Sequence, residues 1–222
     1  MSRKKIIIAI ILNLLNTILT FTAILFCLFG NSETYTLKLK SFRYFTIDST
    51  ILMAFAAAFW TAKLVRKLEN PDLKIPEWAY RLKFIATVNI DLSFLTVLFF
   101  LAPRAWITKG FPAAFAFFNG TNIVMHLLSP ILSTVSLMSF CGDRRFSIKD
   151  CFLSLIPPAI YAVVYVIMVC IVKLWNDYYG FTFGGRYQFV PVVMAVFFAM
   201  VFLIAFLLKL FRKRSVAKES KK

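Results

Sequence analysis

Six polar residues recur every three or four positions in one apolar stretch. They are Asn119, Asn122, His126, Ser129, Ser133 and Ser136. Because a helix repeats every 3.6 residues, this spacing predicts one polar stripe along a single helix. His126 is the only histidine of the chain, and imidazole is the natural proton carrier near neutral pH. The stripe therefore fits two roles, which are hydrogen bonding between packed helices and proton transfer through His126.

A threonine that could act as a nucleophile lies at the start of the second apolar run. Thr46, Ser49 and Thr50 share one helical face, whereas Asp48 points elsewhere. Thr46 and His126 both fall within the first two turns of helices that enter from the same side, so we expect them at equal depth. A neutral histidine can take the proton of a threonine hydroxyl and activate it as a nucleophile. The alternative is that Thr46 bonds back to its own helix.

Asp91 is the one carboxylate that lies clearly inside an apolar run. An ionised aspartate at the centre of a spanning helix costs roughly 2.5–3.5 kcal/mol, so it needs a partner. One interpretation is that Asp91 orients or charges His126. The other is a hydrogen bond between helices, to Asn13 or Asn16.

Two asparagines complete the set of candidate site residues. Asn122 lies one turn before His126 and is our candidate donor to an oxyanion, and Asn89 forms a second polar face on the helix of Asp91. The four cysteines are scattered, with no C-x-x-C motif and no histidine nearby. That spacing suits neither a zinc site nor a redox pair, so we predict no metal and no cofactor.

The elements that must position these residues are six apolar runs. They cover about 6–29, 45–62, 84–102, 113–140, 151–172 and 187–211. Each is near or above the roughly 20 helical residues that cross a bilayer core of about 30 Å. Backbone groups cannot hydrogen-bond to lipid, so each run should be helical. We predict an all-α polytopic membrane protein, in which residues 1–222 form one six-span bundle and 212–222 a basic tail.

Irregular points are expected at prolines and glycines. Gly120 should end a short outer segment, so that the fourth span covers 119–140. Pro157 and Pro158 should bend the fifth span, and Pro191 should lie in the first turn of the sixth. The polar and aromatic loop 175–181 fits two interpretations, a lid or a membrane-interface belt.

The charge of the chain indicates its orientation in the membrane. The formal net charge is +16, yet the basic residues are spread over loops and ends, which argues against nucleic acid as a partner. Most of them fall on the side of the two termini, including the flanking residues Lys83 and Arg212. The excess of Lys and Arg in cytoplasmic loops then predicts that both termini are cytoplasmic, in the cell membrane. Membrane lipids are the expected partners.

Two short motifs resemble a known family. The stretch Ser41 to Thr46, SFRYFT, followed later by Met125, His126 and Pro130, is similar to the androgen-induced-gene family of transmembrane threonine hydrolases and its bacterial membrane relatives. The resemblance implies six helices around a lipid-accessible cavity, a threonine nucleophile at Thr46 and a catalytic histidine at His126. Two features differ: the spacing from His126 to Pro130 is four rather than five, and the segment around 176–179 lacks the family's histidines.

Together these features predict a lipid ester hydrolase in which Thr46 attacks the acyl carbonyl and His126 accepts its proton. The bacterial relatives match this Phe- and Lys-rich chain better than the animal enzymes do, so we expect a bacterial membrane. Two other classes stay open. The polar stripe could line the pathway of a small-molecule transporter, or the protein could be a non-catalytic membrane-binding protein in which His126 only joins helices.

Overall fold

The computed structural model describes residues 2–30, 38–142 and 144–219, and six helical segments in it are long and apolar enough to cross a membrane. No strand occurs in these ranges, which confirms the predicted all-α class. The first two spans are single helices, α1 (Arg3–Phe29) and α2 (Phe45–Glu69). The third combines α3 (Glu77–Thr96), a π turn η2 (Val97–Leu101) and α4 (Ala102–Lys109).

The other three spans are also built from several pieces. The fourth consists of α6 (Thr121–Ile123), the π turn η4 (Val124–Leu128) and α7 (Ser129–Phe140). The fifth consists of α8 (Ile148–Leu153), α9 (Ile156–Val166) and the π turn η5 (Ile167–Ile171). The sixth begins with η6 (Tyr187–Phe189) and continues as α10 (Val190–Glu219). The short elements outside the spans are η1 (Lys38–Arg43), α5 (Phe111–Phe115) and η3 (Ala116–Phe118).

The predicted basic tail is therefore helical over most of its length. Residues 212–219 continue α10 without a break, whereas residues 220–222 lie outside the described ranges. The helix extends because nothing in this part of the chain, neither proline nor glycine, interrupts it.

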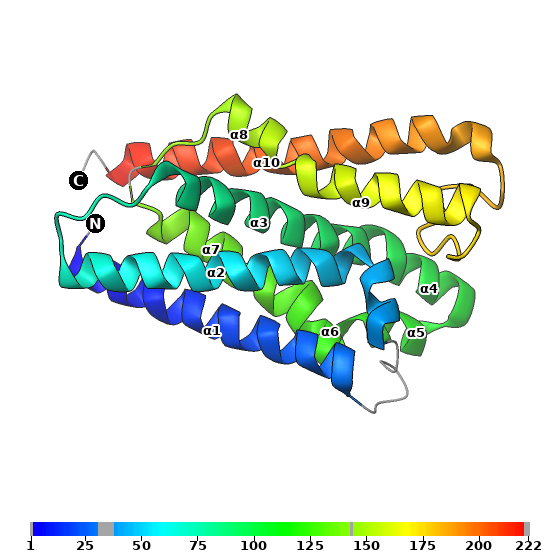
Figure 1. Ribbon diagram of the computed structural model, residues 1–222, viewed down its shortest axis with the longest axis horizontal. Helices are drawn as coiled ribbons and strands as arrows, with labels where there is room; N and C mark the ends of the chain where they lie inside the picture. Colours follow the sequence, from blue (N-terminus) through cyan, green and yellow to red (C-terminus); the bar gives the residue numbers. More distant parts are fainter. Residues whose placement is uncertain (1, 31–37, 143, 220–222) are drawn as a thin grey trace.

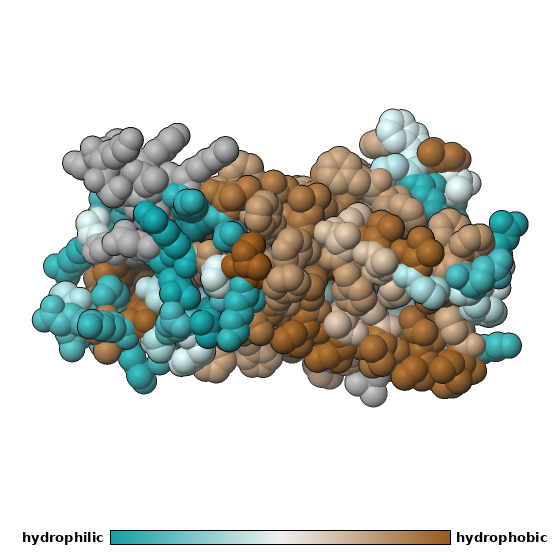
Figure 2. Space-filling view, turned by 90° about the horizontal axis from the view of Figure 1, so that it is seen from above, coloured by the Kyte–Doolittle hydropathy of each residue, from teal (hydrophilic) through white to brown (hydrophobic). Residues whose placement is uncertain are grey.

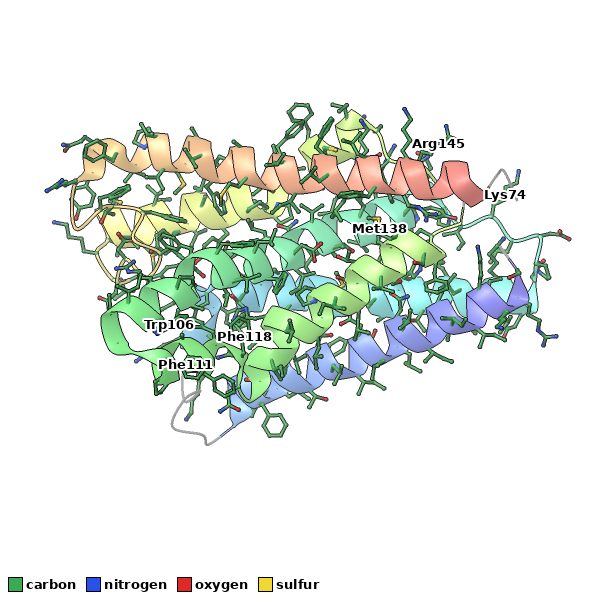
Figure 3. The ribbon with its side chains drawn as sticks, turned by 180° about the vertical axis from the view of Figure 1, so that it is seen from behind. Lys74, Trp106, Phe111, Phe118, Met138 and Arg145 are labelled. Atoms are coloured by element: carbon green, nitrogen blue, oxygen red, sulfur yellow. The ribbon has the colours of Figure 1, made fainter. Side chains whose placement is uncertain are left out.

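The six spans lie along the long axis of the molecule, and the beginning of α1 lies at the same end as the last turns of α10 (Figure 1). We call this the terminal end; the distal end is opposite and carries α4, α5 and the 172–186 loop. On the face seen in Figure 2, apolar side chains cover the middle of the molecule, hydrophilic side chains gather at the terminal end, and the distal end carries both kinds. Lys74 and Arg145 lie at the terminal end, whereas Trp106 and Phe111 lie at the distal end (Figure 3). This distribution is that of a protein spanning a bilayer.

Helix α3 occupies the centre of the bundle, where it packs against α2, α7, α8 and α10. Every residue from Ala86 to Ser93 is buried. The approach of α2 is close because Ala56 and Ala57 meet Ala86 in one apolar cluster, and small residues let helix backbones come together. Polar side chains on α3 must therefore find their partners inside the protein.

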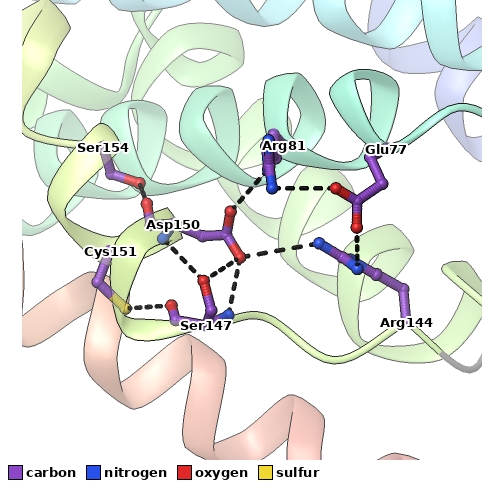
Figure 4. Close-up of polar contacts among 7 residues, drawn as sticks. All are labelled: Glu77, Arg81, Arg144, Ser147, Asp150, Cys151 and Ser154. Carbon is purple, nitrogen blue, oxygen red and sulfur yellow. Dashed lines mark hydrogen bonds and ion pairs between the residues drawn. The ribbon is translucent and has the colours of Figure 1, made fainter.

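Ion pairs fasten α8 to the beginning of α3 at the terminal end (Figure 4). The fully buried Asp150 forms a capping box with Ser147 and accepts a hydrogen bond from Arg81 Nε at 3.1 Å. Glu77 pairs with Arg81 at 3.0 Å and with Arg144 at 2.6 Å. Because the Asp150 carboxylate is buried, its four partner atoms compensate its lost hydration, and the network fixes the 144–150 segment.

Prolines and glycines mark the irregular points, as predicted. The fifth span breaks between α8 and α9, where Pro157 and Pro158 occupy the first turn of α9. Pro191 lies in the first turn of α10. Gly120, at φ 56°, separates the outer segment from the fourth span, and Gly110, at φ 85°, turns the chain from α4 into α5. Both glycines have a positive φ, which residues with a β-carbon rarely adopt.

Candidate functional site

A cavity of about 860 Å³ lies between the third span and α10. Side chains of α3, η2 and α4 form one wall, and residues of α10 from Val193 to Leu207 form the other. Residues 179–184 close it at the distal end, and Tyr161 of α9 contributes from the side. The lining is almost wholly apolar. Its hydroxyl and charged side chains are those of Thr46, Ser93, Thr96, Tyr161, Tyr179 and Arg104.

Tyrosines from the fifth span and the following loop hold the first turn of α2, which carries Thr46. The backbone N–H of Phe45 donates to Tyr179 Oη at 3.1 Å, and Tyr161 Oη donates to the carbonyl of Arg43 at 2.6 Å. The first amides of a helix have no partner within it, so the Tyr179 hydroxyl serves as a cap where Tyr44 supplies none. No local pattern in the sequence identifies either tyrosine as a partner of α2, because both act from segments more than 100 residues away.

Thr46 is half-buried and lines the cavity, and its hydroxyl forms no hydrogen bond within the described residues. The helix-directed bonds that the alternative interpretation expected are made by its neighbours instead. Ser49 Oγ and Thr50 Oγ1 donate to the Thr46 carbonyl at 3.0 and 2.6 Å. The Thr46 hydroxyl is thus available to a molecule in the cavity.

His126 is buried in the π turn η4, with only 5% of its surface exposed. Its Nδ1 has no hydrogen-bond partner among the described residues, and its ring lies 6.4 Å from that of Phe117. The preceding Met125 packs with Ile47 in one apolar cluster, which places the segments of Thr46 and His126 at the same level.

The two side chains do not meet in this structure. No hydrogen bond joins Thr46 to His126, and His126 is not among the cavity-lining residues. The reason is rotational, since consecutive helical residues point about 100° apart. Ile47 and Met125 point into the same apolar cluster, so their neighbours Thr46 and His126 point to other sides of their helices.

A proline explains the π turn that carries His126. Pro130 has no N–H to donate to the carbonyl of His126, four residues earlier, and its ring would clash with that carbonyl in a regular helix. The chain widens instead, and Ser129 N–H bonds to the Val124 carbonyl, five residues back. Pro103 follows η2 in the same way, with Ala102 N–H bonded to Val97. Both π turns thus border the candidate site, where such turns are frequent.

Asp91 bonds to a partner that the sequence did not indicate. Its Oδ2 accepts a hydrogen bond from Thr134 Oγ1 of α7 at 2.7 Å, rather than from His126, Asn13 or Asn16. Thr134 lies beside the predicted polar stripe, one residue after Ser133, and so was not among the candidates.

Lys83 and Arg212 correct the predicted distribution of charge. Both were expected at the membrane surface, but Lys83 is fully buried and Arg212 is 1% exposed. Lys83 Nζ donates to Asn13 Oδ1 at 2.6 Å, and Asn13 Nδ2 donates to Ser136 Oγ at 2.7 Å. Arg212 donates to the carbonyls of Met138 and Gly142, which ties α10 to the end of α7.

Helices α1 and α7 run antiparallel in a register fixed by two contacts. Asn13 meets Ser136 near the terminal end, and Cys27 Sγ lies 3.9 Å from Thr121 Oγ1 near the distal end. A residue further along α1 from Asn13 therefore lies level with a residue about the same number of positions before Ser136, in α7 or in the turns that precede it. Of the predicted stripe, His126 and the three serines lie buried on this contact face, whereas Asn119 is exposed.

Between those contacts the helices enclose polar atoms that have no hydrogen-bond partner in the described part of the chain. The register sets Asn16 level with Ser133, and neither its Oδ1 nor its Nδ2 has a partner among the described residues. The same holds for Ser129 Oγ. We call the following set the polar core: Asn13, Asn16, Lys83, Asp91, Ser129, Ser133, Thr134 and Ser136. None of these residues lines the cavity, so the polar core is separate from the cavity.

The two candidate asparagines serve the local structure. Asn122 Nδ2 donates to the Ala116 carbonyl at 2.9 Å and joins the outer segment to the fourth span. Asn89 Nδ2 donates to the carbonyls of Ile85 and Ser154, towards α8. Neither bond involves Thr46 or a cavity-lining group.

The loop after the fifth span forms the distal wall of the cavity, and Asp177 organises it. Its carboxylate accepts hydrogen bonds from Tyr165 Oη, from the N–H of Phe181, and from both the N–H and the hydroxyl of Thr182, all at 2.7–2.8 Å. Burial opposes ionisation, but these hydrogen bonds outweigh it and hold the pKa of Asp177 below its usual range. These hydrogen bonds join loop 175–181 to Tyr165 of the fifth span, and Tyr179 of the same loop is buried in the cavity wall.

Comparison of the chain with protein-family models, curated protein sequences and solved structures gives no match in any of the three. The described residues contain no group of three His, Cys, Asp or Glu side chains that could hold a metal ion. The candidate site therefore consists of an apolar cavity with Thr46 in its wall, and His126 buried at the same level behind it.

Proposed function

We propose that this protein is a lipid ester hydrolase of a bacterial cell membrane, with Thr46 as nucleophile and His126 as base. One observation carries the proposal. Thr46 presents a hydroxyl that is free of described partners in the wall of an otherwise apolar cavity. The motif around Thr46 and His126, similar to that of the androgen-induced-gene hydrolases, supports the same chemistry.

The size of the cavity suits an acyl chain. Its α10 wall runs from Val193 to Leu207, about 21 Å at a helical rise of 1.5 Å per residue. The hydrocarbon of one leaflet is about 15 Å deep, so the wall is long enough to accompany one chain of a membrane lipid. An apolar lining with few polar groups is typical of sites that orient one reactive group of a ligand.

In the proposed reaction, Thr46 Oγ attacks the ester carbonyl carbon while His126 takes the hydroxyl proton. The C–O bond to the alcohol then breaks, and the imidazolium returns the proton to the leaving oxygen. Water hydrolyses the acyl-threonine and restores the hydroxyl. Because the two side chains do not touch in this structure, binding of the ester must first bring the imidazole to Thr46.

The proposal is tested by turnover of a long-chain fluorogenic ester and by labelling with a fluorophosphonate probe, both on purified protein. Thr46→Ala should abolish labelling and lower turnover by at least about a thousandfold, because the nucleophile is gone. His126→Gln should lower turnover by about a hundredfold or more, the usual contribution of a general base. Thr46→Ser, which keeps the hydroxyl, should retain labelling.

Thr61→Ala is the matched control, since Thr61 lies on the same helix, bonds to its own backbone and does not line the cavity. It should behave like the parent protein. Full labelling and turnover in Thr46→Ala would remove Thr46 as the nucleophile, and the lack of both in the parent protein would end the hydrolase proposal.

A second candidate is a lipid-binding protein without catalysis. The lack of contact between Thr46 and His126 favours it, because a resting catalytic pair usually shares a hydrogen bond. In that case the cavity still retains acyl chains, but the parent protein shows neither labelling nor turnover. A transport function would instead use the polar core, which lies apart from the cavity.

A further inference from the structure

A second pocket of about 460 Å³ opens at the distal end, next to the cavity. The two spaces share three lining residues, Arg104, Gly180 and Gly184. The second pocket is lined mainly by polar residues and backbone of α4, η5 and the following loop. A single molecule with an apolar chain and a polar head can therefore occupy both at once.

The lining of this second pocket is positively charged. Arg104 of α4 and Lys173, which follows η5, are both exposed, and neither forms an ion pair within the described residues. The one acidic residue of the lining, Asp177, already accepts four hydrogen bonds from its own surroundings. Two cations against one carboxylate leave the lining with a net charge of about +1, and the carboxylate is turned to its own donors, so the pocket complements an anion.

The backbone makes room for both cations. A β-carbon placed on Gly180 would lie 3.0 Å from Arg104 Nη1, so glycine at this position lets the guanidinium pass between the two pockets. Lys173 has a φ of 56°, a conformation that favours glycine, and yet the chain carries a lysine there. Its charge at this point therefore comes with a local conformational cost.

We propose that the two pockets together bind a phospholipid with an anionic phosphate headgroup, of the phosphatidylglycerol type. The phosphate lies between Arg104 and Lys173, and guanidinium groups match phosphate oxygens in a bidentate manner. One acyl chain enters the cavity beside α10. The volume of about 460 Å³ exceeds the need of a bare carboxylate and suits a phosphate with its glycerol group.

This inference builds on the proposed function by naming its substrate class. Thr46 and Arg104 line the same cavity, so a lipid held by its phosphate has its ester linkages between the headgroup site and the acyl chain, on the side of Thr46. The headgroup site is nevertheless a binding claim that can be tested without any turnover.

The test is a competition measured by native mass spectrometry on delipidated protein. It offers phosphatidylglycerol and phosphatidylcholine with identical acyl chains, so that only the headgroup differs. We expect about a tenfold preference for phosphatidylglycerol, which two partly exposed charge contacts can supply. The double variant Arg104→Gln, Lys173→Gln should remove the preference while still binding both lipids through the cavity. Lys109→Gln is the matched control, because Lys109 is exposed on α4 but lines neither pocket.

Two results would overturn the inference: equal retention of the two lipids by the parent protein, or an unchanged preference in the double variant. Palmitate is the third competitor, and displacement of phosphatidylglycerol by equimolar palmitate would identify a fatty-acid site and contradict the phospholipid. Gly180→Ala should weaken the preference by crowding Arg104.

The fluorophosphonate experiment separates this inference from the proposed function. An unreactive Thr46 leaves the headgroup preference intact, whereas a lost headgroup site leaves Thr46 labelling intact.

Discussion

Lys83 shows how a charge is accommodated inside this bundle. Its ammonium group has Asn13 Oδ1 as hydrogen-bond acceptor, and Asn13 is itself held by Ser136. Burial raises the pKa of the nearby Cys141 thiol to about 11, so Cys141 is neutral and supplies no counter-charge. Asn13 Oδ1 is thus the one hydrogen-bond acceptor of the ammonium group among the described residues, and the carboxyl group of Asp91 adds an electrostatic interaction through space.

Two asparagines one turn apart should respond in opposite ways to the same substitution. Asn13→Leu removes the acceptor of a buried ammonium and should lower stability by about 2–3 kcal/mol. Asn16→Leu removes an amide that has no described partner and should leave stability unchanged or raise it by about 1 kcal/mol. Thermal unfolding of both variants in the same detergent measures the difference. Equal destabilisation would mean that Asn16 is as well bonded as Asn13.

The residues of the site were partly accessible from the sequence. The equal level of Thr46 and His126 could be predicted, because both lie near the start of helices that enter from the same side, whereas their catalytic roles stay a proposal. The burial of Lys83 could not be predicted, because a lysine at the edge of an apolar run fits a surface position equally well. Thr134 was missed because helical spacing does not identify the partner on another helix.

The π turn before Pro130 sets where the His126 ring points. Pro130→Ala supplies the missing N–H and should let the helix close into regular α geometry, which turns His126 relative to α7. The histidine is unique, so selective ¹⁵N labelling gives one imidazole spin system to follow by NMR. Its signals should shift in Pro130→Ala and stay in place in Pro112→Ala, which changes an exposed proline of α5. An unshifted signal in Pro130→Ala would show that the proline does not set the ring position.

The loop that closes the cavity should depend on the Asp177 carboxylate. Asp177→Ala removes four hydrogen bonds and should lower stability by roughly 2 kcal/mol, or free the loop for proteolysis. The pKa of Asp177 is depressed, so its contribution is complete above the ordinary aspartate pKa of about 3.9 and is lost as the pH falls through the lower, folded value. Limited proteolysis between pH 6 and pH 3 measures this. Acid sensitivity that persists unchanged in Asp177→Ala would assign the effect to another group.

The elements were predicted better than their contacts. Hydropathy located six spans, and prolines and glycines located their breaks, because both follow from local backbone chemistry. The third span is longer than expected, Glu77 to Lys109, since α4 continues it beyond the apolar run. Which tyrosine caps α2 depends on a loop more than 100 residues away, and no local pattern encodes that.

The whole molecule should sit in the membrane with its terminal end in the cytoplasm, because most of its basic residues lie there. The test uses a membrane-impermeant maleimide on intact cells. Lys109→Cys, at the distal end, should be labelled from outside, and Lys74→Cys only after lysis. The parent chain is the control, since three of its four cysteines are buried and the fourth is half-buried. The reverse pattern would invert the orientation.

Helix α10 is attached to the bundle unevenly. Among its described side chains, the buried ones are Val201, Ala205, Leu208 and Arg212, while residues 190–200 include no buried side chain. The wall of the cavity begins in this loosely held part, at Val193, and extends to Leu207. A ligand can therefore arrive sideways by diffusing within the leaflet, without ever passing through water. The effective concentration would then be its mole fraction in the bilayer, so diluting a fixed amount of substrate with inert lipid should slow the protein even though the bulk solution is unchanged.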